Sequence, residues 1–266
     1  MTHTPTSWIW SIFTHAWHLF TTHYKDFLTT AAWLLGIGYL LLSMIPMQLI
    51  ATPVQSGVYS YAFAVDGSLE LMMLHSLLQF AIAILGMYMT AAVFLQVRSF
   101  VDHHRALGWK KALQEAGEML FGILGTTLLQ ILFLFGLLLL LIIPGIIFFV
   151  YWVFTVYVVV HYGKKRRAAL DESKRIVKWR RWKTVGYMIV LYLPMIIISA
   201  CLQWVLKASY GLWGWAFFPD LIHNGAMLVM QVFYSIVASL FFLQWDRSRI
   251  GTTQQHQHAP VHHHEA

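Results

Sequence analysis

The stretch that decides the fold runs from Met119 to Tyr162 and reads MLFGILGTTLLQILFLFGLLLLLIIPGIIFFVYWVFTVYVVVHY. Its 44 residues include no Asp, Glu, Lys or Arg. A helix needs about 20 apolar residues to cross a hydrocarbon core of about 30 Å, so this tract is long enough for two crossings. Pro144 and Gly145 interrupt the tract, and because proline lacks an amide and glycine tolerates a positive φ, the pair predicts a turn. We therefore predict two membrane spans, at about 119–143 and 146–162.

The composition of the whole chain agrees with a membrane protein. Of the 266 residues, 59% are apolar and 11% are charged, and the mean hydropathy is +0.63. Soluble domains carry about 25% charged residues, which cover the surface that faces water. The composition therefore argues against a soluble enzyme and excludes a disordered chain.

Four further apolar segments bring the predicted number of spans to six, and they lie at about 30–50, 71–97, 185–206 and 224–245. The longest segment between spans has 22 residues, which is too short for a soluble catalytic domain. Amphipathic patterns precede the first, third and fifth spans. The predicted fold class is all-α integral membrane, with six transmembrane helices as three hairpins, each preceded by an amphipathic cytoplasmic interfacial helix.

Three segments follow from this organisation. Residues 1–29 are predicted to form an N-terminal amphipathic helix at the interface, because aromatic residues recur there at a spacing of three and four. Residues 30–249 form the six-span membrane domain. Residues 250–266 are polar and His-rich and are predicted to be a disordered cytoplasmic tail.

The basic residues predict the orientation in the membrane. Counted over alternate segments, 17 of the 18 Lys and Arg residues fall on one side of the predicted membrane and one falls on the other. Segments rich in Lys and Arg stay in the cytoplasm. Both termini are therefore predicted to be cytoplasmic, which agrees with an even number of spans.

The region around the Pro-Gly pair carries a recognisable pattern. An apolar run ends in Pro144-Gly145-Ile146, a second apolar run follows, and a short helix then presents Ala169, Leu170 and Ser173. From about Phe100 to about Gly186 the chain resembles the YciC-like uncharacterised bacterial inner-membrane proteins and the related membrane domain of some glycerophosphoryl diester phosphodiesterases. This resemblance implies a location in the bacterial inner membrane, and the biochemical role of the family is largely unassigned. The chain departs from the pattern at His161-Tyr162-Gly163, where many members carry an acidic residue, and it has no phosphodiesterase domain.

The densest cluster of charge lies between the fourth and fifth spans, where ten Lys and Arg residues occur within 163–184. One interpretation is a topology signal that anchors the chain among headgroups. The other is a binding site for anionic phospholipid headgroups, because arginine matches phosphate oxygens and tryptophan favours the interface. The candidate residues are Lys164, Lys165, Arg166, Arg167, Arg175, Trp179, Arg180, Arg181 and Trp182. Nucleic acid is not an expected partner, because a membrane-adjacent basic helix already faces lipid phosphates.

Polar residues inside the spans suggest an alternative function. His75 and Gln79 lie one turn apart on one helix face, and Gln130 lies near the middle of the third span. They favour a carrier or channel for a small or amphiphilic solute, or simply hydrogen bonds between helices. No catalytic motif is present, so we expect a noncatalytic protein without cofactors and assign no metal ligands. The sequence leaves open whether the histidines of the tail bind metal. The sequence leaves open whether the chain forms a homo-oligomer or binds another membrane protein.

Overall fold

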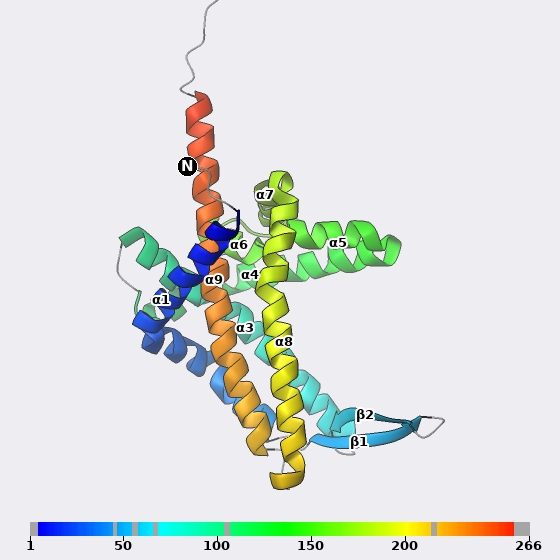
Figure 1. Cartoon of the computed structure of the whole chain (residues 1–266). Coiled ribbons are helices and arrows are strands. Elements are labelled where there is room, and N and C mark those ends of the chain that lie inside the picture. Colours follow the sequence, from blue (N-terminus) through cyan, green and yellow to red (C-terminus); the bar gives the residue numbers. More distant parts are fainter. Residues whose placement is uncertain are drawn as a thin grey trace, which may run out of the picture.

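The computed structural model describes residues 5–44, 47–54, 58–65, 69–103, 107–213 and 217–257, and they are overwhelmingly helical (Figure 1). In chain order the elements are α1 (Pro5–Ala31), a π-helical turn (Ala32–Gly36), α2 (Ile37–Ser43), β1 (Met47–Val54), β2 (Val58–Val65), α3 (Leu69–His103), α4 (Trp109–Leu140), α5 (Ile142–Tyr151), α6 (Thr155–Tyr162), α7 (Arg167–Val177), a 3-10 turn (Lys178–Arg180), α8 (Arg181–Trp213) and α9 (Phe217–Gln257).

Among the described residues, six helical runs are long and apolar enough to cross a membrane, which confirms the predicted number of apolar helices and indicates a multi-pass membrane protein. These runs are Trp10–Ser43, Leu69–His103, Trp109–Leu140, Ile142–Tyr162, Arg167–Leu202 and Asp220–Asp246.

The first run differs from the prediction at both ends. The predicted interfacial helix and the first span form one helical run from Pro5 to Ser43, with irregular backbone at His23 (φ −120°, ψ 24°). The run ends at Ser43 and not near residue 50, because β1 and β2 pair as an antiparallel hairpin, with Met47 opposite Val65 and Val54 opposite Val58. Aromatic and β-branched residues, which favour strands, are frequent in this segment. The hairpin is an addition to the predicted all-α architecture.

The other long helices extend beyond the predicted spans. A hydropathy pattern marks only the apolar part of a helix, and here the amphipathic residues 109–118 continue into α4 without a break. Helix α9 continues to Gln257, so the first eight residues of the predicted disordered tail are helical, and 258–266 lie outside the described residues.

An aromatic cluster packs α3, α6 and α9 together, with Phe94, Tyr157 and Phe242 at its centre. The ring centroids of Phe94 and Tyr157 lie 5.4 Å apart, and those of Tyr157 and Phe242 lie 5.6 Å apart. Helix α8 joins the cluster through Tyr187, whose ring stacks on Phe241. Such aromatic pairs contribute about 0.5–1.5 kcal/mol each beyond the area that they bury.

The turn between the third and fourth apolar helices lies earlier than predicted. Helix α4 ends at Leu140, Leu141 is extended (φ −154°, ψ 111°), and α5 begins at Ile142. Pro144 therefore lies in the first turn of α5, where a missing amide removes no helical hydrogen bond. Gly145 does not have a positive φ. Its role is close approach, because a Cβ at this position would lie 2.6 Å from Cδ2 and 3.2 Å from Cα of Leu138.

The α4–α5 hairpin points away from the rest of the helices. Figure 1 shows α4 and α5 side by side, running across the direction of α8 and α9. Its side chains are largely exposed, and Leu140 at the tip is 76% exposed. The hairpin therefore presents an apolar surface that the described part of the chain does not cover.

Candidate functional site

Helix α7 is fixed to the hairpin by the residues that carry the family resemblance. Ala169, Leu170 and Ser173 are all buried, and Ser173 Oγ donates a hydrogen bond to the carbonyl oxygen of Tyr151 at 2.8 Å. Because α5 ends at Tyr151, that carbonyl has no partner within its helix. Ala169, Leu170 and Ser173 therefore join α7 to the end of α5, while Pro144 and Gly145 lie in the first turn of α5, against α4.

Two of the predicted headgroup residues form ion pairs with a buried carboxylate. Glu172 is only 5% exposed, and its Oε2 lies 2.7 Å from Lys164 Nζ. Its Oε1 lies 2.6 Å from a guanidinium nitrogen of Arg175. A buried carboxylate is stable only with such partners. Lys164 and Arg175 therefore neutralise the buried charge of Glu172.

Three more of the predicted basic residues contact neighbouring elements. The backbone amide of Arg166, a residue with positive φ (53°), donates to Thr126 Oγ1 on α4 at 2.8 Å. The aliphatic part of Lys165 lies against Gly122 of α4, while the guanidinium of Arg180 lies 5.6 Å from the centroid of the Trp245 ring.

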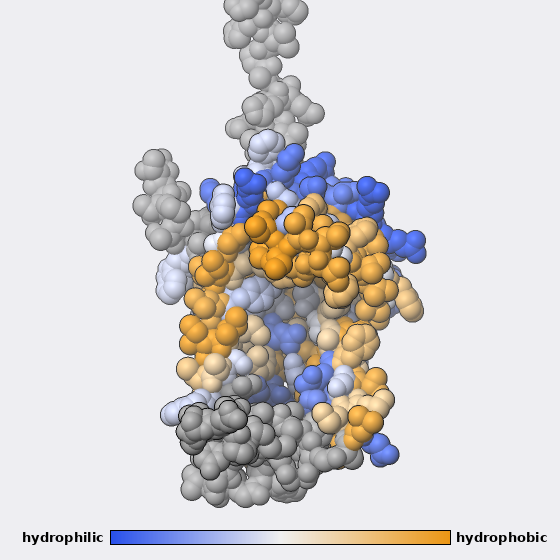
Figure 2. Space-filling view, turned by 90° about the vertical axis from the view of Figure 1, so that its right-hand side faces the viewer, coloured by the Kyte–Doolittle hydropathy of each residue, from blue (hydrophilic) through white to orange (hydrophobic). Residues whose placement is uncertain are grey.

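A further set of basic and aromatic side chains forms an exposed surface, which we call the basic belt. Trp179 is 87% exposed and Trp182 is 78% exposed, and Arg181 and Lys183 make no ion pair with the described residues. Figure 2 shows hydrophilic residues directly above the apolar tip of the hairpin. The belt consists of Lys165, Arg167, Lys178, Trp179, Arg181, Trp182 and Lys183.

A buried acidic residue lies beside the departure from the family pattern. The Oδ2 atom of Asp246, on α9, lies 3.3 Å from Nε2 of His161. The hydroxyl of Tyr162 donates a hydrogen bond to Oδ1 of the same carboxylate. A carboxylate from α9 therefore lies against the end of α6. Sequence reasoning missed it because 84 residues separate Tyr162 from Asp246. The only indication in the sequence was the position of Asp246, a single acidic residue directly after the last apolar segment.

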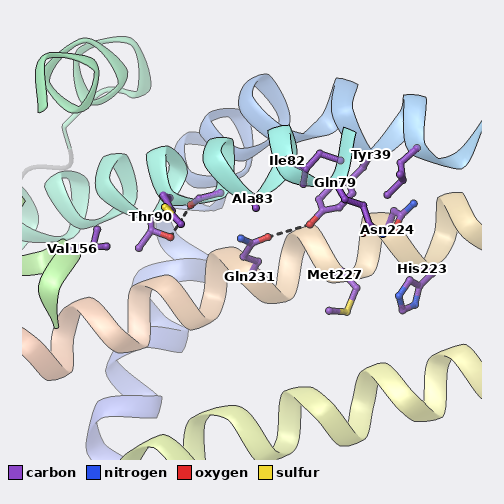
Figure 3. A pocket seen from close by; sticks show the side chains of 13 residues that line it. Tyr39, Gln79, Ile82, Ala83, Thr90, Val156, His223, Asn224, Met227 and Gln231 are labelled. Atoms are coloured by element: carbon purple, nitrogen blue, oxygen red, sulfur yellow. Dashed lines mark hydrogen bonds between the residues drawn. The ribbon is translucent and has the colours of Figure 1, made fainter. Parts of the chain in front are cut away.

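The polar residues of the spans fall into two separate places. Gln79 Nε2 lies 2.9 Å from His75 Nε2, and Gln79 lines a cavity of about 570 Å³ between α2, α3 and α9 (Figure 3). Gln130 lies elsewhere, within the hairpin, where its Nε2 donates to the Trp152 carbonyl at 3.4 Å. The cavity also contains Tyr39 and Asn224, which sequence reasoning did not single out because they belong to other spans.

Comparison with known proteins found no matching family model, no matching curated protein and no matching solved structure. The resemblance to the YciC-like proteins therefore stays a prediction from the residues quoted above.

Proposed function

We propose that the chain is a noncatalytic multi-pass protein of the bacterial inner membrane whose basic belt binds anionic phospholipid in the cytoplasmic leaflet. The observation that supports this most is the position of Trp179 and Trp182. Both indoles are almost fully exposed, they lie among cations, and an exposed apolar hairpin lies at the same end of the molecule. Tryptophan is enriched at the level of lipid headgroups, where its apolar ring and its N–H group both find partners.

The α4–α5 hairpin extends this surface into the hydrocarbon. By length α4 could cross a membrane, but the hairpin runs across α8 and α9 (Figure 1), and Ser173 holds its base to α7. We therefore place the hairpin within the cytoplasmic leaflet, directly below the basic belt. The positive-inside assignment does not change, because both ends of the hairpin stay on one side in either arrangement.

The electrostatic contribution of the belt is large enough to matter. A basic residue near an anionic membrane surface contributes about 1 kcal/mol. Arg167 pairs weakly with Asp171 at 3.9 Å, so it contributes less than Lys178, Arg181 or Lys183. Lys165, Lys178, Arg181 and Lys183 are the other four cations of the belt, and at about 1 kcal/mol each they supply on the order of 4 kcal/mol of attraction toward anionic lipid.

Mass spectrometry of lipid retained by the purified protein tests the proposal. The test variant carries Arg181→Gln and Lys183→Gln, and the matched control carries Lys110→Gln and Lys111→Gln, which removes the same charge from the start of α4. We expect anionic lipid per chain to fall several-fold in the test variant and to stay near the wild-type level in the control. Equal loss in both variants, or loss in neither, contradicts binding at the belt.

A further inference from the structure

The cavity between α2, α3 and α9 has the chemistry of a binding site that is independent of the basic belt. We infer that it binds an uncharged, hydroxyl-bearing molecule. Figure 3 shows Tyr39 from α2 and Gln231 from α9 pointing toward one another, and the Tyr39 hydroxyl donates to Gln231 Oε1 at 3.3 Å. Gln79 of α3 and Asn224 of α9 lie beside them.

The lining residues favour an uncharged ligand. The polar lining residues carry three carboxamides, two hydroxyls and one imidazole, and they are Tyr39, Gln79, Thr90, His223, Asn224 and Gln231. No Asp, Glu, Lys or Arg is among the described residues that line the cavity. The cavity is partly open, since Gln79 is exposed, but it lies between apolar helices long enough to span a membrane, where a phosphate or an ammonium group requires an opposite charge. Carboxamides and hydroxyls both donate and accept hydrogen bonds, which matches the two roles of a ligand hydroxyl.

Several of these polar groups have hydrogen-bonding capacity left over. The amide nitrogen of Gln79 is engaged with His75 and that of Asn224 donates to Ser43 Oγ at 2.9 Å, so each retains its carbonyl oxygen as an acceptor. The Nδ1 atom of His223 is buried and has no partner among the described residues. An unmet buried polar group is destabilising, and a bound hydroxyl that pairs with it removes that cost.

Small residues of α3 make room for the ligand. A Cβ at Gly86 would lie 3.0 Å from Gln231 Nε2, so glycine lets this amide lie across the helix. The volume of about 570 Å³ is typical of small-molecule sites and far exceeds the roughly 30 Å³ that one water occupies. Apolar side chains such as Ile82, Met87 and Met227 complete the wall and suit the carbon skeleton of a polyol.

The same hydroxyl chemistry is available from a free polyol and from the glycerol group of a neutral lipid. Equilibrium binding to the purified full chain in phosphatidylcholine nanodiscs distinguishes them, because no anionic lipid is then present for the basic belt. One arm uses radiolabelled myo-inositol as the free polyol. The other uses nanodiscs that contain labelled diacylglycerol, with retention on the protein measured after exchange into unlabelled nanodiscs.

The test variant carries Gln79→Leu and Gln231→Leu, Tyr39→Phe is a milder variant, and Gln130→Leu is the matched control outside the cavity. We expect saturable binding in one arm, weakened at least tenfold by the double substitution, weakened less by Tyr39→Phe and unchanged by Gln130→Leu. Thermal unfolding identifies any variant that fails to fold, in which case Tyr39→Phe decides. Absence of saturable binding in both arms, or equal binding by the cavity variants and the control, overturns the inference.

Discussion

The Gly145→Ala substitution probes the tight turn at the tip of the α4–α5 hairpin. The new Cβ would lie 2.6 Å from Cδ2, 2.7 Å from Cγ and 3.2 Å from Cα of Leu138. The Leu138 side chain can rotate away, but its Cα belongs to the backbone of α4 and cannot move without shifting the helix. Overpacking of this kind costs about 1–3 kcal/mol.

Gly136→Ala is the matched control, because no atom lies within 4 Å of a Cβ at that position. Both substitutions replace a helical glycine with alanine, which by itself gains about 0.5–1 kcal/mol, so the difference between the two variants isolates the steric cost. For a chain of this size, each kcal/mol changes the melting temperature by about 2–4 °C. We expect Gly145→Ala to melt roughly 2–12 °C below Gly136→Ala in thermal unfolding of the detergent-solubilised protein.

A double variant completes the test. Adding Leu138→Ala to Gly145→Ala removes the side-chain part of the clash, so the two substitutions together should destabilise less than the sum of their separate effects. Equal melting temperatures for Gly145→Ala and Gly136→Ala, or additive effects in the double variant, would refute the close approach of α4 and α5.

Three further substitutions test the junction around α7. Glu172→Gln leaves Lys164 and Arg175 without their carboxylate, and because both cations are partly exposed we expect it to lower the free energy of unfolding by only about 1–2 kcal/mol, measured by thermal unfolding. The control Asp171→Asn, at an exposed pair, should lower it by less than about 0.5 kcal/mol. Equal effects of the two substitutions contradict the buried carboxylate. Ser173→Ala leaves the Tyr151 carbonyl unpaired, so we expect about 1–2 kcal/mol of destabilisation and faster proteolysis between α6 and α8; unchanged proteolysis contradicts docking through this bond. Gly163 has φ 65°, a left-handed conformation that alanine disfavours, so Gly163→Ala should lower the free energy of unfolding by about 1 kcal/mol in the same thermal measurement. Gly163→Asn should lower it less, because asparagine tolerates this conformation. The reverse order contradicts the positive φ.

The part of the fold that follows from hydropathy could be predicted from the sequence. Each apolar helix corresponds to a continuous apolar run of sequence, and its capacity to cross a membrane follows from length and composition. The direction of the α4–α5 hairpin could not be predicted, because it depends on Ser173 meeting a carbonyl 22 residues earlier. The exact turn was missed for a local reason: the Pro-Gly pair suits the start of a helix and a close contact as well as it suits a turn.

The candidate sites divide in the same way. The cluster of cations was visible as a run of charge, but its division into residues that compensate Glu172 and residues of the basic belt required three-dimensional contacts. His75 and Gln79 were visible because they lie one turn apart. Tyr39 and Gln231, which are 192 residues apart, come together only when α2 and α9 pack.

The proposal that the hairpin and the basic belt share the cytoplasmic leaflet is tested most directly by thiol accessibility. In a Cys201→Ser background, which removes the chain's single cysteine, Leu141→Cys places one thiol at the tip of the hairpin and Lys183→Cys places one in the belt. A membrane-impermeant maleimide should label Lys183→Cys only in inverted vesicles and should leave Leu141→Cys unlabelled in right-side-out vesicles. Labelling of Leu141→Cys from the outer face would show that the hairpin crosses the membrane and would contradict the shared leaflet.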